Sequence, residues 1–380
     1  MKFIHLSDLH LGKRPDGFSL QEDQQYILDR ILEIAAEEKP DAVFIAGDVY
    51  DKALPPAEAV ELLDDFLVRL TRLGGKTFVI SGNHDSPERL AFGSRLMQEG
   101  GLYIAPVYDG NVEPVPVRDA WGEVLVYMLP FVKPAAVRHR FPDENIETWT
   151  DAVRTAVAHM PAGDGARQII LSHQFITGAE RSDSGIVPVG GLDNVDASAY
   201  DGFDYVALGH LHRPQMIGSS GRIRYAGTPL KYSFSEVNDR KSVTVGEMDG
   251  TGAVSLREIP LVPLRDLKEI RGRYDDLMRK SFYEGTSYQT DYMRIILTDE
   301  EDVPEAAAKL RLVYHNLAKL DYDNKRTRHE GTPEALAGGK ELSPLEMFEA
   351  LYEQQNGTPF SEEQKAFAES LIRSVWEEEA

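Results

Sequence analysis

Five short apolar segments in the first 212 residues each end in side chains that can bind a metal ion. The clearest is residues 42–46, which are followed at once by Gly47 and Asp48. A strand that is buried on both faces reads as a continuous apolar run, so Asp48 is predicted to lie just beyond the carboxyl end of an interior strand. Open α/β sheets bind ligands at that end, and the segment therefore predicts a site there.

The other four segments, residues 2–7, 76–81, 168–172 and 204–208, repeat this arrangement. They are followed by carboxylate, imidazole and amide side chains, namely Asp8 and His10, then Asn83, His84 and Asp85, then His173, and finally His210 and His212. Five of the chain's ten histidines fall at these strand ends. The pattern predicts one edge of a sheet system that is lined with metal ligands.

Helical patterns between the first strands predict an α/β fold. Ser19 and Glu22 have the spacing of a capping box and precede an amphipathic run that ends at Pro40. Further helices are expected at 55–73 and 86–98, so residues 1–98 read as alternating strands and helices, which is typical of a parallel sheet. Short strands at 102–130, a helix at about 146–159 and a long Gly-rich loop at 177–202 are expected to follow.

Three domains are predicted. Residues 1–260 contain all five motifs, 261–330 read as a small α+β unit, and 331–380 form a linker with two amphipathic helices. Each of these two helices starts with capping-box spacing, at Ser343 and at Ser361. In the small unit, strands are expected at 263–270 and 292–297, and helices at 273–280 and 304–317.

Composition excludes several kinds of protein. No apolar run reaches the length of a membrane span, and the first strand follows Met1 directly, so we expect a cytoplasmic protein with no membrane association. The absence of cysteine excludes thiolate ligands and a cysteine nucleophile. A formal net charge of −22 argues against a surface that binds nucleic acid over its whole extent, although it permits a local basic groove.

The ligand types point to hydrolysis at phosphorus. Oxygen and imidazole ligands without sulfur suit Mn²⁺, Fe²⁺ or Zn²⁺ better than a pure Mg²⁺ site. Seven ligands are too many for one ion and suit two, with Asp48 as the bridge. Such a pair of ions can hold a bridging hydroxide as the nucleophile. His84, with Asp85 behind it, is expected to assist the leaving group, whereas His5 is expected to be structural and Asp51 to cap a turn.

The motifs Asp-x-His, Gly-Asp-x-x-Asp, Gly-Asn-His-Asp, a lone His and Gly-His-x-His resemble those of the calcineurin-like metallophosphoesterases. This resemblance covers residues 1–212 and implies two packed sheets flanked by helices. It also implies two groups of ligands that share one carboxylate. One metal would be held by Asp8, His10, Asp48 and His212, and the other by Asp48, Asn83, His173 and His210. His84 would assist the leaving group.

Longer segments at 7–12, 81–90, 190–193, 207–215 and 227–236 look like those of the SbcD nuclease subunits. That resemblance implies Mn²⁺-dependent DNA cleavage, exonucleolytic at ends and endonucleolytic at hairpins, in DNA repair and recombination. It further implies a complex with an SbcC-type ATPase, a small domain that caps the active site, and a homodimer formed through the helices at 55–73 and 86–98.

Contacts with DNA and with the ATPase are assigned to two kinds of segment. Local basic candidates for DNA binding are Lys13, Arg14, Lys133, Arg138, Arg140 and Arg181, with a further group at 325–328. The C-terminal helices are expected to dock on the ATPase; the alternative is that they pack on their own core. Two other functions are weighed: a phosphodiesterase for small phosphate esters, and a non-enzymatic scaffold, which the intact ligand set disfavours.

Overall fold

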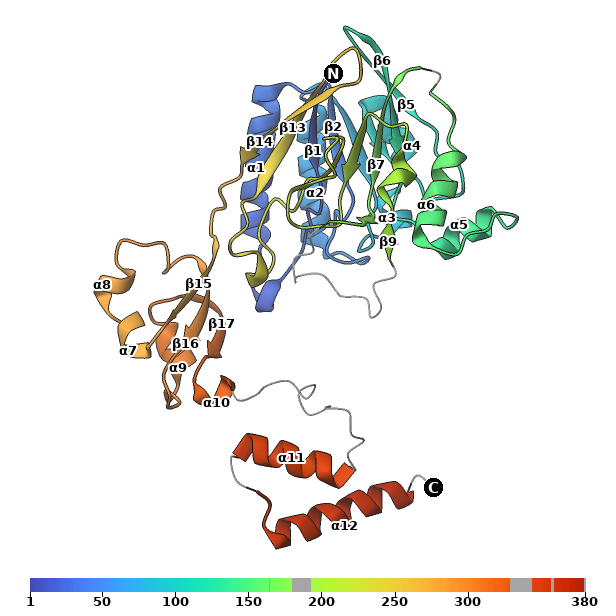
Figure 1. Ribbon diagram of the computed structural model, residues 1–380. Helices are drawn as coiled ribbons and strands as arrows, with labels where there is room; N and C mark the ends of the chain where they lie inside the picture. Colours follow the sequence, from blue (N-terminus) through green and yellow to red (C-terminus); the bar gives the residue numbers. More distant parts are fainter. Residues whose placement is uncertain (164, 180–192, 329–343, 357–358, 379–380) are drawn as a thin grey trace. The chain divides into compact units, whose positions relative to one another are not determined.

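The computed structural model describes residues 1–163, 165–179, 193–328, 344–356 and 359–378 (Figure 1). Most of the Gly-rich loop, including Arg181 and the start of the 190–193 segment, therefore lies outside the described residues, as does Ser343. The chain divides into two compact units, Met1–Lys268 and Glu269–Ala380. Within the described ranges, no helix is both long and apolar enough to cross a membrane.

The first unit contains two six-stranded sheets. The strand order of the first is β14-β13-β1-β2-β3-β4. Strands β1 to β4 run parallel, while β13 and β14 are antiparallel additions at one side. Their bounds are β1 Lys2–Leu6, β2 Ala42–Ala46, β3 Lys76–Ile80, β4 Leu102–Ile104, β13 Ser242–Met248 and β14 Val254–Pro260.

The second sheet has the order β11-β12-β10-β7-β6-β5, in which β6, β7, β10 and β12 are parallel. Its strands are β5 Val115–Asp119, β6 Gly122–Met128, β7 Arg167–Ser172, β10 Tyr205–Leu208, β11 Gln215–Ile217 and β12 Ile223–Tyr225. A short pair, β8 Phe175–Ile176 and β9 Asn194–Val195, forms a separate two-stranded sheet that shares a buried cluster with the second sheet.

The two sheets pack face to face through apolar side chains. Phe3 and Phe44 of the first sheet and Tyr205 of the second belong to one buried cluster, and the rings of Phe3 and Tyr205 are 4.8 Å apart. His5 is buried between the sheets, where Nδ1 bonds the Tyr205 hydroxyl (2.9 Å) and Nε2 the Leu208 carbonyl (3.2 Å). These contacts give His5 the structural role expected of it.

Helices flank the packed sheets (Figure 1). The helices α1 (Gln21–Glu38) and α2 (Ala57–Thr71) pack against each other beside the first sheet. On the other side, α5 (Pro134–Arg140) and α6 (Trp149–Ala158) share a buried cluster with the second sheet. The predicted fold of two packed sheets flanked by helices is confirmed.

Several local predictions were wrong. The capping box at Ser19 does not form; α1 begins after Leu20, which makes no side-chain cap. The single helix expected at 86–98 is split into α3 (Pro87–Leu90) and α4 (Ser94–Met97), followed by a 3₁₀ turn, η2 (Gln98–Gly100). Gly93 separates them with φ 73°, a conformation that favours glycine and ends a helix. The helix α5 was not predicted.

The second unit is built on a three-stranded sheet in the order β15-β16-β17. Its elements are β15 Leu267–Gly272, α7 Tyr274–Leu277, α8 Lys280–Tyr283, β16 Tyr292–Leu297, α9 Ala306–Leu310, β17 Asn316–Tyr322 and α10 Lys325–Arg328. The helix predicted to run to residue 317 ends at Leu310. The chain then forms β17, because pairing with β16 outweighs local helix propensity there.

The C-terminal helices α11 (Pro344–Asn356) and α12 (Glu362–Glu378) contact each other. The rings of Tyr352 and Phe360 are 4.4 Å apart, and Gln364 donates to the Tyr352 hydroxyl at 2.9 Å. Ser361 and Gln364 form the predicted capping box through two reciprocal hydrogen bonds. Short 3₁₀ turns elsewhere are η1 Pro15–Gly17, η3 Ala197–Tyr200 and η4 Phe234–Glu236.

Candidate metal centre

The predicted ligands converge at the carboxyl ends of β1, β2, β3, β7 and β10. Their donor atoms form three groups within which all atoms lie within 4.8 Å of one another: Asp8 with His10 and His212, Asp8 with Asp48 and His173, and His10 with Asp51 and His84. Asn83 joins them through its amide oxygen, which lies 3.2 Å from His173 Nε2 and 3.0 Å from His210 Nδ1. All seven side chains predicted as ligands are thus brought together.

The backbone is strained where it presents several of these side chains. Asp8, His10, Asp48 and His210 all have positive φ, between 44° and 102°, a region that non-glycine residues rarely adopt. The loops after β1 and β2 hold each other in this form, because Asp8 N donates to Gly47 O (2.9 Å) and His10 N to Asp48 O (3.0 Å). Strain of this kind concentrates at functional sites.

Glycines permit the close approach of these loops. A Cβ on Gly82 would overlap the Asp48 carboxylate, and one on Gly209 would overlap the carbonyl oxygen of Ala46. A side chain at either position would clash with the neighbouring loop, which explains why glycine precedes Asn83 and His210 in these motifs.

The first group places two imidazoles beside a carboxylate. His10 Nε2 and His212 Nε2 are 3.2 Å apart, and burial holds the pKa of His10 well below its usual value. His10 Nδ1 is buried without a hydrogen-bond partner among the residues described. The Asp8 carboxylate accepts from His210 N, at 3.0 and 3.1 Å. Adjacent imidazole nitrogens and a carboxylate fit a divalent cation.

The second group is centred on Asp48. His173 Nε2 lies 3.2 Å from Asp48 Oδ2, while His173 Nδ1 bonds the Ala46 carbonyl at 2.7 Å. Burial alone would lower the pKa of His173, but the Asp48 carboxylate outweighs it and raises this pKa to about 9. Burial raises the pKa of Asp8 to about 6. Carboxylates buried this close to one another need positive charge nearby, which a divalent ion supplies.

The structure corrects the expected link between Asp85 and His84. The Asp85 carboxylate accepts from three main-chain amides, those of Val49 (3.1 Å), Tyr50 (2.9 Å) and Gly82 (2.9 Å). It thereby ties the loop after β2 to the loop after β3. His84 Nδ1 instead contacts the main-chain oxygen of Asp51 at 2.8 Å. Asp85 positions the loops and does not support the His84 ring.

Three of the basic candidates have partners in the protein. Lys13 pairs with Asp51 (2.7 Å), Arg14 with Glu58 (3.0 Å), and Arg138 donates to the Ile146 carbonyl (2.8 Å). Lys133 and Arg140 are exposed, and their side chains form no hydrogen bond or ion pair within the described part of the chain.

Two residues near the donors are not predicted by the motifs alone. Asp51 is expected only to cap a turn, yet it joins the third donor group. Glu236 ends one of the longer matching segments without an assigned role; it is buried and accepts from His212 Nδ1 at 3.0 Å. The sequence signal for both is their place inside the segments at 47–51 and 227–236.

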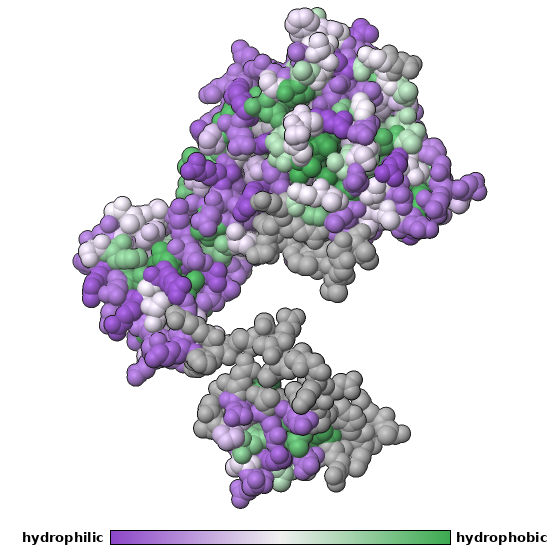
Figure 2. Space-filling model, in the orientation of Figure 1, coloured by the Kyte–Doolittle hydropathy of each residue, from purple (hydrophilic) through white to green (hydrophobic). Residues whose placement is uncertain are grey.

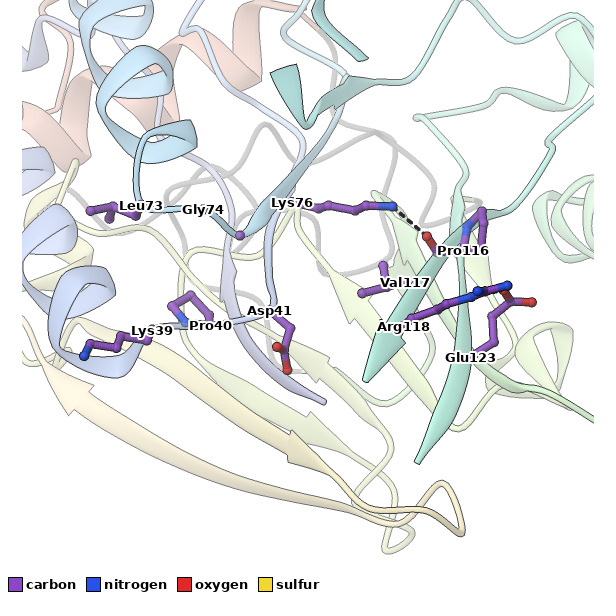
Figure 3. A pocket seen from close by; sticks show the side chains of 11 residues that line it. Lys39, Pro40, Asp41, Leu73, Gly74, Lys76, Pro116, Val117, Arg118 and Glu123 are labelled. Atoms are coloured by element: carbon purple, nitrogen blue, oxygen red, sulfur yellow. Dashed lines mark hydrogen bonds and ion pairs between the residues drawn. The ribbon is translucent and has the colours of Figure 1, made fainter. Parts of the chain in front are cut away.

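A large open hollow of about 740 Å³ lies elsewhere in this unit (Figure 3). It is lined by the segments just before β2 and β3 and by β5, including Asp41, Lys76 and Arg118. These are the amino ends of the parallel strands, opposite the metal ligands. The Lys76 side chain extends across it, and Nζ donates a hydrogen bond to the Pro116 carbonyl at 2.7 Å (Figure 3). The hollow is therefore separate from the donor cluster.

Comparisons with known proteins agree with this geometry. The calcineurin-like phosphoesterase family matches residues 1–214, and the family described as type 5 capsule protein repressor C-terminal domain matches residues 263–356. The SbcD subunit of the SbcCD nuclease of Staphylococcus epidermidis is 35% identical over 324 residues, which is 84% of this chain and 85% of that protein.

Likenesses to solved structures are distant. A protein of Thermus thermophilus is 13% identical with a TM-score of 0.37, over 68% of this chain and 98% of the other. A dimetal phosphatase from Danio rerio is 13% identical with a TM-score of 0.40, over 69% and 96%. The sequence relationships, which span both units, are sufficient: the chain belongs to the SbcD family of calcineurin-like phosphoesterases, which are metal-dependent hydrolytic enzymes.

Proposed function

We propose that this protein is a DNA nuclease that hydrolyses phosphodiester bonds with two divalent metal ions. The observation that carries the proposal is the convergence of carboxylate, imidazole and amide donors at one sheet edge, in a chain related to a nuclease subunit over most of its length. The expected activities are exonucleolytic at double-strand ends and endonucleolytic at hairpins and in single strands, in DNA repair and recombination.

The seven ligands divide into two sets that share Asp48. Asp8, His10 and His212 would hold one ion with it, and Asn83, His173 and His210 the other. Mn²⁺ is the first choice, with Mg²⁺, Fe²⁺ and Zn²⁺ as alternatives. When bound, such ions lower the pKa of water and neutralise charge at phosphorus. The strained, buried loops hold the ligands ready for this task.

His84 is proposed to assist the leaving group. Its main-chain amide donates to Asp48 Oδ1 (2.9 Å), which places the residue beside the ligands. If Nδ1 donates to the Asp51 carbonyl, Nε2 is the nitrogen left to face a substrate. The ring is half-buried and so is open to one side. Asp85 contributes by holding the two loops in place.

An SbcC-type ATPase is the proposed partner. Phe348 of α11 and Phe367 of α12 are 52% and 67% exposed, which leaves apolar surface for a partner helix. The visible face of the protein is largely hydrophilic (Figure 2). Because the net charge of −22 disfavours binding of DNA phosphates, we propose that the ATPase provides part of the DNA-binding surface. The segment 261–330 is proposed as a domain that caps the active site, between the nuclease domain 1–260 and the docking helices of 331–380.

A homodimer is also proposed. Phe92, which lies between α3 and α4, is 82% exposed, and Leu96 of α4 is 83% exposed. Val60 and Val68 of α2 are exposed as well. Apolar side chains exposed at neighbouring elements favour burial in an interface.

The deciding experiment compares wild type with His84→Gln in the presence of Mn²⁺. Both are assayed on hairpin-ended DNA and on a small chromogenic phosphodiester, and His315→Gln, an exposed histidine of the second unit, is the control. Cleavage of hairpin DNA that is lost only in His84→Gln, with metal content retained, supports the proposal. Turnover of the small ester without DNA cleavage, even with the ATPase added, would replace it by a small-ester phosphodiesterase.

A second experiment tests the docking helices. Deletion of residues 340–380 is expected to abolish binding to the ATPase and to leave Mn²⁺-dependent activity of the chain intact. Unfolding of the truncated chain would instead favour packing of these helices on their own core.

A further inference from the structure

A buried ionic network lies directly behind one of the two ligand sets. Glu236, Lys241 and Asp239 have 0%, 6% and 8% exposure, and Lys241 Nζ lies 2.6 Å from Glu236 Oε2. The other oxygen of Glu236 accepts from His212 Nδ1 at 3.0 Å. Burying ions carries a large desolvation penalty, and apolar side chains would stabilise a core at least as well. The network therefore calls for a role beyond stability.

Its geometry fixes the orientation of His212. With the Nδ1 proton donated to Glu236, the lone pair of His212 is on Nε2, the atom that faces His10 Nε2 at 3.2 Å. Lys241 also donates to the main-chain oxygen of His212 at 2.9 Å, so the network holds both the ring and the backbone of this residue. Thr228 Oγ1 adds a weaker contact to Glu236 at 3.4 Å.

The Glu236 carboxylate is kept ionised in this position. Burial would raise the pKa of Glu236, but the hydrogen bond from His212 and the charge of Lys241 outweigh it and lower this pKa to about 2. A carboxylate behind an imidazole ligand makes the other ring nitrogen a stronger donor to a metal.

The second ligand set lacks this support at the corresponding nitrogen. His173 Nδ1 bonds a neutral main-chain carbonyl, that of Ala46. In the same set, His210 Nδ1 lies 3.0 Å from the neutral amide oxygen of Asn83. The two cation positions are therefore built differently: His212 of the first set is backed by a buried carboxylate, and His173 of the second set by a main-chain carbonyl.

We propose that Glu236 is a positioning residue that selectively strengthens the metal position formed by Asp8, His10 and His212. Lys241 supports this role by balancing the negative charge of the Glu236 carboxylate. This inference rests on the ligand sets in the proposed function and does not depend on DNA being the substrate.

The test measures Mn²⁺ binding to the full-length, metal-free protein by calorimetry. Wild type is expected to bind two ions; in Glu236→Gln the dissociation constant of one should rise about 10- to 100-fold while the other is unchanged. Glu236→Ala should weaken the same position at least as much. Asp119→Asn removes a carboxylate that pairs with Arg167 at the opposite end of the sheets, and it should leave both constants within about threefold.

A double variant asks whether Glu236 acts through His212. In a His212→Gln background, Glu236→Gln should change Mn²⁺ affinity no further. Independent effects of the two substitutions would overturn the proposal, as would wild-type binding of both ions by Glu236→Gln and Glu236→Ala.

A measurement on the wild-type protein covers the case in which the variants do not fold. ¹⁵N chemical shifts of the metal-free protein should show His212 with its proton on Nδ1, and a proton on Nε2 would overturn the proposal. If two Mn²⁺ ions bind as expected but no DNA is cleaved, the proposed function fails and the role of Glu236 stands.

Discussion

At the carboxyl ends of β1, β2 and β10, the backbone is strained and charged groups are buried beside one another. At the amino ends of the same sheets, charged groups form ion pairs. Lys2 pairs with Glu38 at 3.0 Å, and Arg167 makes two hydrogen bonds to Asp119 at 2.6 and 2.9 Å. One edge is arranged for binding and chemistry, and the other holds the sheets together.

The two ends of a single strand therefore serve different purposes, since the carboxyl end serves function and the amino end serves stability. Residues at the carboxyl edge are expected to matter for metal binding and catalysis, and residues at the amino edge for the free energy of unfolding. Substitutions that are matched across the two edges test this division between function and stability.

The largest effect is expected from Asp48→Asn. This carboxylate is the one shared by both proposed ligand sets, so its loss should reduce Mn²⁺-dependent phosphodiester hydrolysis by about 10³-fold or more. Asp41→Asn makes the same change at the other end of β2, where Asp41 accepts from Lys2 N at 2.7 Å. It should retain activity within about twofold. Steady-state assays on both variants measure the contrast, and comparable losses would remove it.

Gly82→Ala is expected to have the next largest effect. The added Cβ would displace the Asp48 carboxylate, and displacement of a catalytic group by about 1 Å can cost about 10²-fold in rate. Gly100→Ala is the control, because a Cβ on Gly100 would have no atom within 4 Å. Metal content and activity of the two variants are compared. A fully active Gly82→Ala enzyme would show that the close packing of these loops is not required.

Asp48 also shows what can be predicted from the sequence. Asp48 is identifiable because a buried parallel strand reads as a continuous apolar run, and the residue after it faces the binding edge. The five strand ends, and hence the sheet edge with its donors, follow from the same rule. The fold of two packed sheets comes from the family resemblance of the motifs.

Features that depend on long-range contacts are not predictable in this way. Glu236 lies 24 residues beyond His212, and its burial against that ring depends on how the loop after β12 folds back. The expected role of Asp85 is wrong because adjacency to His84 in sequence suggests contact, whereas its carboxylate turns to the amides of Val49 and Tyr50. The strand β17 is not predicted, because its pairing with β16 is not visible locally; only its first two residues, Asn316 and Leu317, fall within the helix expected at 304–317.

Asp119→Asn tests the amino edge. Removing the charged partner of Arg167 should lower the free energy of unfolding by about 2–3 kcal/mol near pH 7 and leave activity unchanged. Hydrogen bonds from Arg167 hold the pKa of Asp119 below its usual value. The contribution is therefore complete above the unfolded-state pKa of about 4 and is lost as the pH falls toward the lower folded-state pKa.

Urea unfolding of wild type and Asp119→Asn at several pH values between about 3 and 7 measures this. The difference between the two proteins should be constant down to about pH 5 and should shrink below about pH 4. A difference that grows on acidification would contradict the assignment of the pair.

The smallest effect is expected for exposed cations near the carboxyl edge. Lys133 and Arg140 follow β6, which runs parallel to β7, and their side chains are exposed. If each contacts one phosphate, replacing both with Gln should weaken DNA binding several-fold and reduce the slope of log affinity against log salt by about 2. Replacing Lys39 and Arg118, which line the hollow at the amino edge, should leave this slope unchanged.

Both pairs remove the same charge from the chain, so a general electrostatic effect would lower affinity equally in each. If DNA runs along the carboxyl edge, replacing Lys133 and Arg140 changes the slope of log affinity against log salt. Replacing Lys39 and Arg118 then leaves this slope unchanged. The measurement is fluorescence anisotropy of a hairpin DNA at several salt concentrations, with the single chain and without the ATPase. Equal slopes in the two variants would mean that exposed charge at this edge does not guide DNA to the metal ligands.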